Sequence, residues 1–279
     1  MKDSAVTSKN KYIEKSGQTD DIVRLLARLR ARADTAYDHT YHHKLRGRLW
    51  RALRDTEYEQ YHDENRPVGL TYSNPFPPRD MEEGDERTLL IAAPQEQLLA
   101  EVAEDFIGDR ELNIGEMPFH IDELTSIAPD VGEPGSTGTL ETGTGLLVRI
   151  PPWRAEDYGI EAENGQATFW RPKHSMEPLR TQLENNLDKK HRLFCPERLP
   201  GPSDKEYPLF DDYELIKTFS IPVTVSEGTE MTYVLSKWRF GYTVRDDDHR
   251  RHLNLALDTG LGERNALGLG FMNITDYAE

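Results

Sequence analysis

The chain has 279 residues, 36% of them hydrophobic and 30% charged, and its 50 Asp and Glu side chains outnumber 34 Lys and Arg to give a formal net charge of −16. This length suffices for two domains that each bury a core, whereas no apolar run approaches the ~20 residues of a membrane span. A single cysteine, Cys195, excludes an internal disulfide and a cysteine-rich zinc site, which fits a reducing cytoplasm.

The acidic composition bears on the choice of partner. An acid-rich, lysine-poor chain is typical of proteins that work in very high salt, although a soluble acidic protein without that adaptation has the same pattern. Acidity at first argues against a nucleic-acid partner, because phosphate affinity usually comes from positive potential. In multimolar salt, however, the Debye length is about 3 Å or less. Local arginines would then decide whether RNA binds.

The first part of the chain predicts a tail and one α+β domain. Residues 1–21 are polar and carry no apolar core of a signal peptide, so we interpret them as a disordered tail or a start-site extension. In 22–130 the apolar patterns predict a β-α-β-β-α-β order, which indicates a ferredoxin-like domain. Its expected elements are a strand at 23–32, a helix at 41–53, strands at 69–73 and 87–93, a helix at 95–106 and a strand at 112–116.

The first predicted helix is strongly basic. Leu45, Leu49 and Leu53 recur at helical spacing and indicate its buried face. Cations on the other face are candidates for phosphate contacts, and they are Lys44, Arg48, Arg51 and Arg54. Between positions 41 and 54 there are five Lys and Arg and no acid. A charge run is usually a solvated face, but a basic face in an acidic protein is more informative.

The remaining chain predicts a linker and a second domain. Residues 131–145 are rich in Gly, Ser and Thr, which suggests a linker. The pattern in 146–279 fits a second, irregular ferredoxin-like unit. Its expected elements are strands at 146–150, 215–223 and 231–240, helices at 177–194 and 249–258, a glycine-rich loop and a closing strand at 269–274. The strand at 231–240 interleaves aromatics with Lys237 and Arg239, which could stack bases and hold phosphates, although such residues are more often core.

The glycine-rich stretch 258–273 carries four glycines around Arg264 and Asn265. Glycine permits positive φ and close approach of backbone N–H groups to an anion. The order helix, loop, strand and the lack of a Gly-Lys-Ser/Thr argue against the dinucleotide fingerprint and the P-loop. Two interpretations stay open: a phosphate-contacting loop, or an ordinary glycine-capped helix followed by a turn.

Three histidines could carry chemistry. His42 and His43 lie on the basic helix and His62 in the loop after it, and histidine can exchange a proton near neutral pH without a cofactor. The alternatives are a buried helix residue for His42 and a surface loop residue for His62. The cluster 246–249 reads as a helix N-cap, and neither a metal-ligand set nor a Ser-His-Asp triad stands out. We therefore expect no metal or cofactor.

The segment Gly262–Phe271, GERNALGLGF, closely resembles the C-terminal glycine-rich motif of the CRISPR-associated endoribonucleases that cut repeat precursor RNA into guide units. The predicted first strand, the basic helix and the YHDENRP segment at 61–67 fall where that family's elements fall. The resemblance covers about 22–279 and is to the salt-adapted archaeal branch. It implies two tandem ferredoxin-like domains, metal-independent cleavage by 2′-hydroxyl attack, and delivery of the guide RNA to a multisubunit interference complex.

The resemblance also implies roles for individual residues. His62 matches a loop histidine that acts as general acid/base in some members, and His43 or His42 matches the helix histidine of others. Trp50 stands where a tyrosine often serves, and Val68 near a site where some members carry a lysine. Charge stabilisation is therefore expected from Arg66, Lys44 or Arg48.

Two functions remain as hypotheses from the sequence. The first is an endoribonuclease that acts on CRISPR repeat RNA as a cytoplasmic monomer or homodimer with no membrane association. The alternative is a non-catalytic RNA-binding subunit of the same kind of complex. In both cases the glycine-rich loop is expected to dock the RNA, through Gly262, Arg264, Asn265, Gly268 and Gly270. Replacing Gly268 or Gly270 is then expected to weaken RNA binding before it affects proton transfer.

Overall fold

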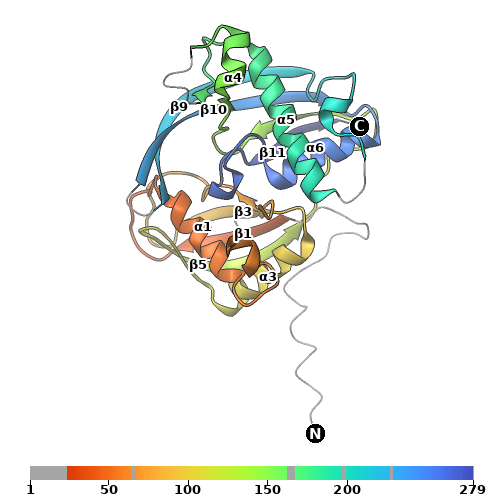
Figure 1. Ribbon diagram of the computed structural model, residues 1–279. Helices are drawn as coiled ribbons and strands as arrows, with labels where there is room; N and C mark the ends of the chain where they lie inside the picture. Colours follow the sequence, from red (N-terminus) through yellow and green to blue (C-terminus); the bar gives the residue numbers. More distant parts are fainter. Residues whose placement is uncertain (1–23, 64–66, 162–166, 196–198, 227–228, 279) are drawn as a thin grey trace.

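The computed structural model describes residues 24–63, 67–161, 167–195, 199–226 and 229–278, and it contains two halves, each with its own antiparallel sheet (Figure 1). A cluster of buried apolar side chains in the first half runs from Leu25 to Leu124, and a second cluster runs from Val131 to Met272. The fold is therefore mixed α/β, with one main core in each half and a third, smaller cluster around Leu235 and Leu269.

The first half has a five-stranded sheet in the order β2-β3-β1-β5-β4. Its elements are β1 (Arg24–Ala31), α1 (Tyr41–Ala52), α2 (Glu59–Asp63), β2 (Thr71–Tyr72), β3 (Glu86–Ala92), α3 (Glu96–Gly108), β4 (Glu111–Ile114) and β5 (Met117–Ile127). Alternate residues of β1, such as Leu25, Ala27 and Leu29, point into the core. The main elements follow the predicted β-α-β-β-α-β order, while α2 and β5 were not predicted.

The second half has a four-stranded sheet in the order β11-β6-β10-β9 and a small β7-β8 pair. Its elements are β6 (Thr137–Thr142), β7 (Arg149–Ile150), α4 (Pro152–Ala155), η2 (Glu156–Tyr158), β8 (Thr168–Phe169), α5 (Met176–Phe194), η4 (Pro202–Asp204), β9 (Asp212–Ser226), β10 (Thr229–Thr243), α6 (Asp247–Thr259), η5 (Asn265–Leu267) and β11 (Met272–Ala278). Asp246 caps α6 by accepting from the His249 backbone N–H, as the sequence predicted.

The interpretation of 131–145 as a linker is wrong, because this segment contains strand β6. β6 pairs with β10 on one side and with β11 on the other, so it is a central strand of the second sheet. Glycine-rich composition was misleading here because Gly138 is required by packing: a Cβ there would overlap the Tyr242 side chain. The predicted strand at 146–150 is correspondingly short, with only Arg149–Ile150 assigned to β7.

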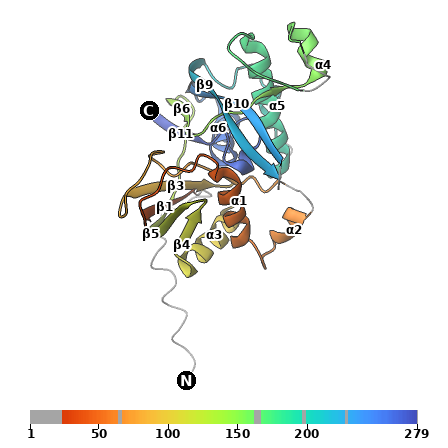
Figure 2. The same ribbon diagram turned by 90° about the vertical axis from the view of Figure 1, so that its left-hand side faces the viewer.

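Buried contacts hold the two halves together. The guanidinium of Arg24 on β1 donates to the backbone oxygen of Leu257 at 2.5 Å and to Asn273 Oδ1 at 3.3 Å, and it lies over the Phe271 ring. Asp258 is buried nearby, and burial raises the pKa of its carboxyl to about 8 while Arg24 opposes that shift. The long β9–β10 hairpin also reaches from the second half to α1 (Figures 1 and 2).

Within the described residues, none of the helices is both long and apolar enough to cross a membrane.

Candidate nucleic-acid interface

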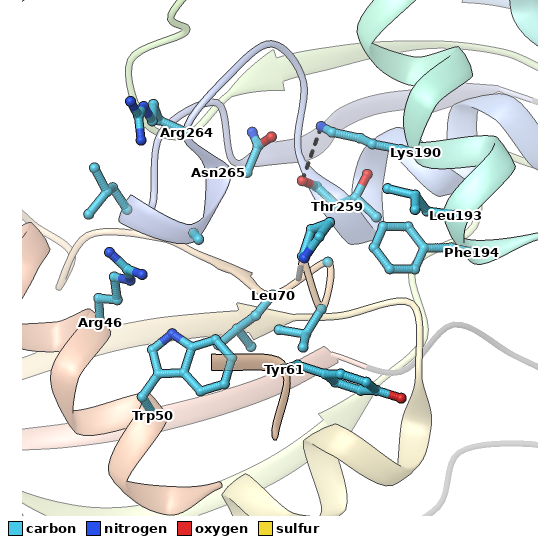
Figure 3. Close-up of a pocket in the computed structure, with 15 residues that line it drawn as sticks. Arg46, Trp50, Tyr61, Leu70, Lys190, Leu193, Phe194, Thr259, Arg264 and Asn265 are labelled. Carbon is cyan, nitrogen blue, oxygen red and sulfur yellow. Dashed lines mark hydrogen bonds between the residues drawn. The ribbon is translucent and has the colours of Figure 1, made fainter. Parts of the chain in front are cut away.

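A cleft of about 300 Å³ lies where the two halves meet. Figure 3 shows that side chains from both halves turn toward it: Arg46 and Trp50 from α1, Tyr61 from α2, Lys190 and Phe194 from α5, and the glycine-rich loop. The full lining is Arg46, Trp50, Tyr61, Pro67, Val68, Gly69, Leu70, Lys190, Leu193, Phe194, Thr259, Arg264, Asn265, Ala266 and Leu267. The cleft thus brings together segments more than 200 positions apart in the sequence.

The charge of the cleft is opposite to that of the whole chain. Its lining includes three cations, Arg46, Lys190 and Arg264, and no Asp or Glu among the residues that the structure describes there. The chain as a whole has a net charge of −16. A cation-lined concavity with apolar and aromatic walls is suited to an anionic ligand that also presents flat apolar surface, as a nucleotide does.

Helix α1 presents one face to this cleft. Arg46 and Trp50 line it, and they are separated by one helical turn. His43 lies three positions before Arg46 and seven before Trp50, which places it on the same face of the helix. His43 is exposed. His43 is not one of the residues that line the cleft, but of the two predicted histidines with described side chains it is the accessible one.

His42 has a different environment. Its ring is buried, stacks on Tyr41, and donates from Nδ1 to the backbone oxygen of Leu267 at 2.8 Å. Burial lowers the pKa of His42 to about 4, against the effects of the Leu267 hydrogen bond and of Asp38. The hydroxyl of Tyr72 donates to the His42 backbone oxygen at 2.8 Å. His42 joins α1 to the glycine-rich loop, and its neutral, buried ring is a poor candidate for catalysis near neutral pH.

The side chains of two predicted site residues, His62 and Arg66, lie outside the part of the chain that the structure describes. His62 belongs to the short helix α2, but its side chain is outside the described residues, as is Arg66 entirely. The roles expected for both remain predictions.

The other predicted cations of α1 do not line the cleft. Arg48 is buried, forms an ion pair with Asp105 and lies over the Phe106 ring, so the interpretation of this side chain as an RNA contact is corrected. Lys44 and Arg51 are exposed and form surface ion pairs, Lys44 with Asp38 and Arg51 with Asp109. These two keep their predicted role only as candidates outside the cleft.

The glycine-rich loop is shaped by packing of the chain against itself. Gly262, Gly268 and Gly270 all have positive φ. A Cβ would lie 2.5 Å from the Leu147 oxygen at Gly262, would overlap the Tyr72 ring at Gly268, and would overlap the Leu261 oxygen at Gly270. The glycines are thus needed to form the loop and to seat it on the first half.

Arg264 and Asn265 have separate tasks in that loop. Arg264 is exposed, adopts φ of 60° and lines the cleft. Asn265 uses its side-chain amide to donate to the oxygens of Leu261 and Leu269, at 2.9 and 2.8 Å. Asn265 therefore closes the loop, while Arg264 is available to a ligand.

Lys237 and Arg239 lie on β10 and do not line the cleft. Lys237 donates to the Gly143 oxygen at 3.0 Å, and its pKa is lowered by burial and by Lys217. Arg239 pairs with Glu141 and Glu214 on the sheet surface. Their predicted contact with RNA phosphates therefore lies outside the cleft and remains a prediction.

The sequence interpretation missed Lys190 and Arg46. Helical spacing from His43 to Trp50 could have identified Arg46, because positions 43, 46 and 50 share a face. Nothing in the sequence around Lys190 could have linked α5 to the basic helix, since only the docking of the halves brings them together. Among the described residues, no group of three or more His, Cys, Asp or Glu could hold a metal ion.

Comparisons with known proteins identify relatives of this chain. Residues 136–274 match a family profile described as CRISPR associated protein Cas6, C-terminal. The chain is 50% identical to the CRISPR-associated endoribonuclease Cas6 of Haloferax mediterranei, over 91% of this chain and 94% of that protein. It is 25% identical to a second Cas6 endoribonuclease, from Methanocaldococcus jannaschii, over 90% and 99%. A solved structure described as CRISPR associated protein Cas6 has the same fold, with a TM-score of 0.65 at 16% identity over 91% of this chain and 99% of that one.

Proposed function

Because the chain belongs to the Cas6 family of CRISPR-associated endoribonucleases, we propose that it cleaves CRISPR repeat precursor RNA into guide units without a metal ion. The observation that carries this proposal is the cleft between the halves, whose described lining has no carboxylate and carries Arg46, Lys190 and Arg264. Helical spacing places the exposed His43 on the same face of α1 as Arg46 and Trp50. RNA contains its own nucleophile, so such a site needs only a proton acceptor, a proton donor and cations.

The chemistry follows from these groups. A histidine base removes the proton of the 2′-hydroxyl, the resulting oxygen attacks the adjoining phosphorus, and the bond from phosphorus to the 5′-oxygen breaks. A protonated group delivers a proton to the departing 5′-oxygen, leaving a 2′,3′-cyclic phosphate and a 5′-hydroxyl. Arg46 and Arg264 would stabilise the negative charge that builds up on the phosphate oxygens.

Two histidines are proposed for proton transfer. His43 is supported by its exposure and its position on the cleft face of α1. His62 is supported by the family resemblance and by its place in α2, which also carries the cleft residue Tyr61. Arg66, three residues after Asp63 at the end of that helix, is a further candidate cation.

The architecture and the partners extend the proposal. We interpret the first half as a ferredoxin-like unit because of its element order and its antiparallel sheet, and the second as an irregular one. The guide RNA would pass to a multisubunit interference complex. The protein would act in the cytoplasm, where its one cysteine stays reduced.

Two substrates test the reaction. Labelled repeat RNA incubated in potassium chloride with excess EDTA is expected to be cut, and loss of cutting in EDTA would exclude the metal-free mechanism. Repeat RNA with a 2′-deoxy nucleotide at the scissile position is expected to bind and remain intact. If wild-type protein binds repeat RNA but never cuts it, the non-catalytic alternative holds.

Variants of the histidines assign the proton transfer. His62→Ala is expected to lose cleavage while it retains RNA binding. Near-normal cleavage by that variant would assign the proton transfer to His43 instead, and His43→Ala would then be expected to lose cleavage. His120→Ala is the matched control, because His120 is on β5 and pairs with Glu111, away from the cleft lining. Single-turnover rates on the same RNA compare the three variants.

A further inference from the structure

Lys190 on α5 occupies an unusual position in the cleft. Its Nζ donates to the backbone oxygen of Thr259 at 3.3 Å (Figure 3) and to the backbone oxygen of Gly260 at 2.6 Å. These two oxygens belong to the end of α6 and to the first glycine of the glycine-rich loop. The lysine therefore has a defined place at the point where the loop begins, with its ammonium at the wall of the cleft.

The charge of Lys190 has no described anionic partner. Lys44 and Lys205, by contrast, pair with carboxylates, Lys44 with Asp38 and Lys205 with Asp248. The backbone oxygens that hold Lys190 position it but carry no net charge. Burial lowers the pKa of Lys190 to about 7 from the usual 10.5. A partly buried ammonium without a counter-charge is costly unless an anion joins it.

Charged and titratable groups surround Lys190 on several neighbouring elements. Across the cleft are Arg46 on α1, Tyr61 on α2 and Arg264 in the loop, and two of these three repel a cation. Asp258, one residue before Thr259 on α6, is buried and interacts with Arg24 of β1. On α5 itself, Lys189 is exposed and His191 contacts His252 and Arg251 of α6. An added anion in the cleft would therefore meet three cations.

We propose that Lys190 binds a phosphate group of the RNA and takes up a proton from solvent as the RNA enters the cleft. This inference rests on the proposed function only in taking RNA as the ligand. The phosphate supplies the counter-charge that the described protein lacks at this point, which favours the charged ammonium. Because the same Nζ is hydrogen-bonded to the start of the glycine-rich loop, Lys190 also places the phosphate between that loop and α1.

Binding of repeat RNA with a 2′-deoxy scissile nucleotide tests the contact without cleavage. Lys190→Met is expected to weaken binding at pH 7 by about tenfold or more, because it removes a charge-assisted hydrogen bond to the phosphate. Lys189→Met is the matched control, since Lys189 is the exposed neighbour on the same helix, and it is expected to bind as the wild type does. Thermal melting checks that each variant is folded. Equal affinity of folded Lys190→Met and wild type would overturn the proposal.

The pH dependence separates a phosphate contact from a purely structural anchor. Wild-type affinity is expected to fall by at least about tenfold between pH 6.5 and 8.5, because the free protein loses the Lys190 proton in that range. Lys190→Arg, which stays charged, is expected to lose that dependence. Asp258 titrates in a neighbouring range, and it is present in both proteins, so their difference reports on Lys190.

Calorimetry in buffers of different ionisation enthalpy measures the proton directly. At pH 8, RNA binding to wild type is expected to take up close to one proton more than binding to Lys190→Met, to within about 0.3 proton. Equal uptake in the two proteins would refute the inference, even if Lys190→Arg fails to fold. Absence of any RNA binding by wild type would instead refute the proposed function, so the two failures are distinct.

Discussion

Helix α1 and the glycine-rich loop 260–270 both suggested RNA contacts from the sequence, but they have different roles in the structure. The side chains of α1 divide among three environments: His42 and Arg48 are buried, Lys44 and Arg51 pair with surface acids, and only the face with Arg46 turns to the cleft. The glycines of the loop have one common environment, in which each is required by contact with the chain itself.

The comparison shows that residue type alone does not determine whether a residue contacts the ligand or supports the fold. On α1, the position around the helix decides whether a cation can meet a ligand. In the loop, glycines permit close backbone packing, and the ligand-facing group is the single side chain of Arg264. Substitutions of the loop glycines should thus act mainly on stability, whereas those on the cleft face of α1 should act mainly on RNA binding.

The largest effect is expected for Gly270→Ala. A Cβ at this positive-φ position would overlap the Leu261 oxygen, and the strained backbone and the overlap together should destabilise the protein by about 4 kcal/mol. Gly47→Ala is the matched control on α1, where a Cβ meets nothing within 4 Å, and it should stabilise by up to about 1 kcal/mol. Urea unfolding measures both. A well-folded Gly270→Ala that binds RNA poorly would restore the loop glycines as direct contacts.

The next effect is a pH dependence that arises at His42. The pKa of His42 in the folded protein, about 4, lies below the usual 6.5. The stabilisation that the neutral, buried ring gives the fold is therefore complete above pH 6.5 and is lost as the pH falls toward 4. The expected loss is about 3 kcal/mol of unfolding free energy. His42→Gln should have a flatter profile between pH 7 and 4.5 than wild type, whereas His120→Gln should follow wild type. Identical profiles for all three would contradict a buried neutral His42.

A pair of arginines on α1 provides a sharper contrast. Arg48→Met should destabilise by about 2 kcal/mol, because it removes the buried pair with Asp105 and the contact with Phe106, but the folded variant should bind RNA normally. Arg46→Met should leave stability nearly unchanged and weaken RNA binding by about tenfold. Unfolding and RNA titrations at one salt concentration test the contrast, and a reversed pattern would refute the assignment of the helix faces.

The smallest effect is expected for Arg51→Ala. Arg51 and Asp109 are each about half exposed, and such surface pairs contribute about 0.5 kcal/mol. Its loss of RNA affinity should be smaller than that of Arg46→Met, because Arg51 is outside the cleft lining. A larger loss would mean that RNA extends over the exposed face of α1, as the sequence suggested.

Much of the local structure followed from sequence patterns. The helix predicted at 41–53 is α1 at Tyr41–Ala52, and the helix at 177–194 is α5 at Met176–Phe194. Periodic apolar residues predict such elements because burial of one face determines them locally. β6 was missed because its one glycine and three threonines form a strand only between two partner strands. Sheet pairing of that kind is not encoded in the segment itself.

The amino-acid sequence was enough to identify the family, the basic helix, the candidate histidines His43 and His62, and the loop that carries Arg264. Local composition and spacing carry this information, since each motif is contiguous. The tertiary structure was needed to see that His42 and Arg48 are buried, that the loop glycines serve packing, and that Lys190 joins Arg46 and Arg264 in one cleft. These features depend on how the two halves dock, and docking is settled by contacts between residues far apart in the chain.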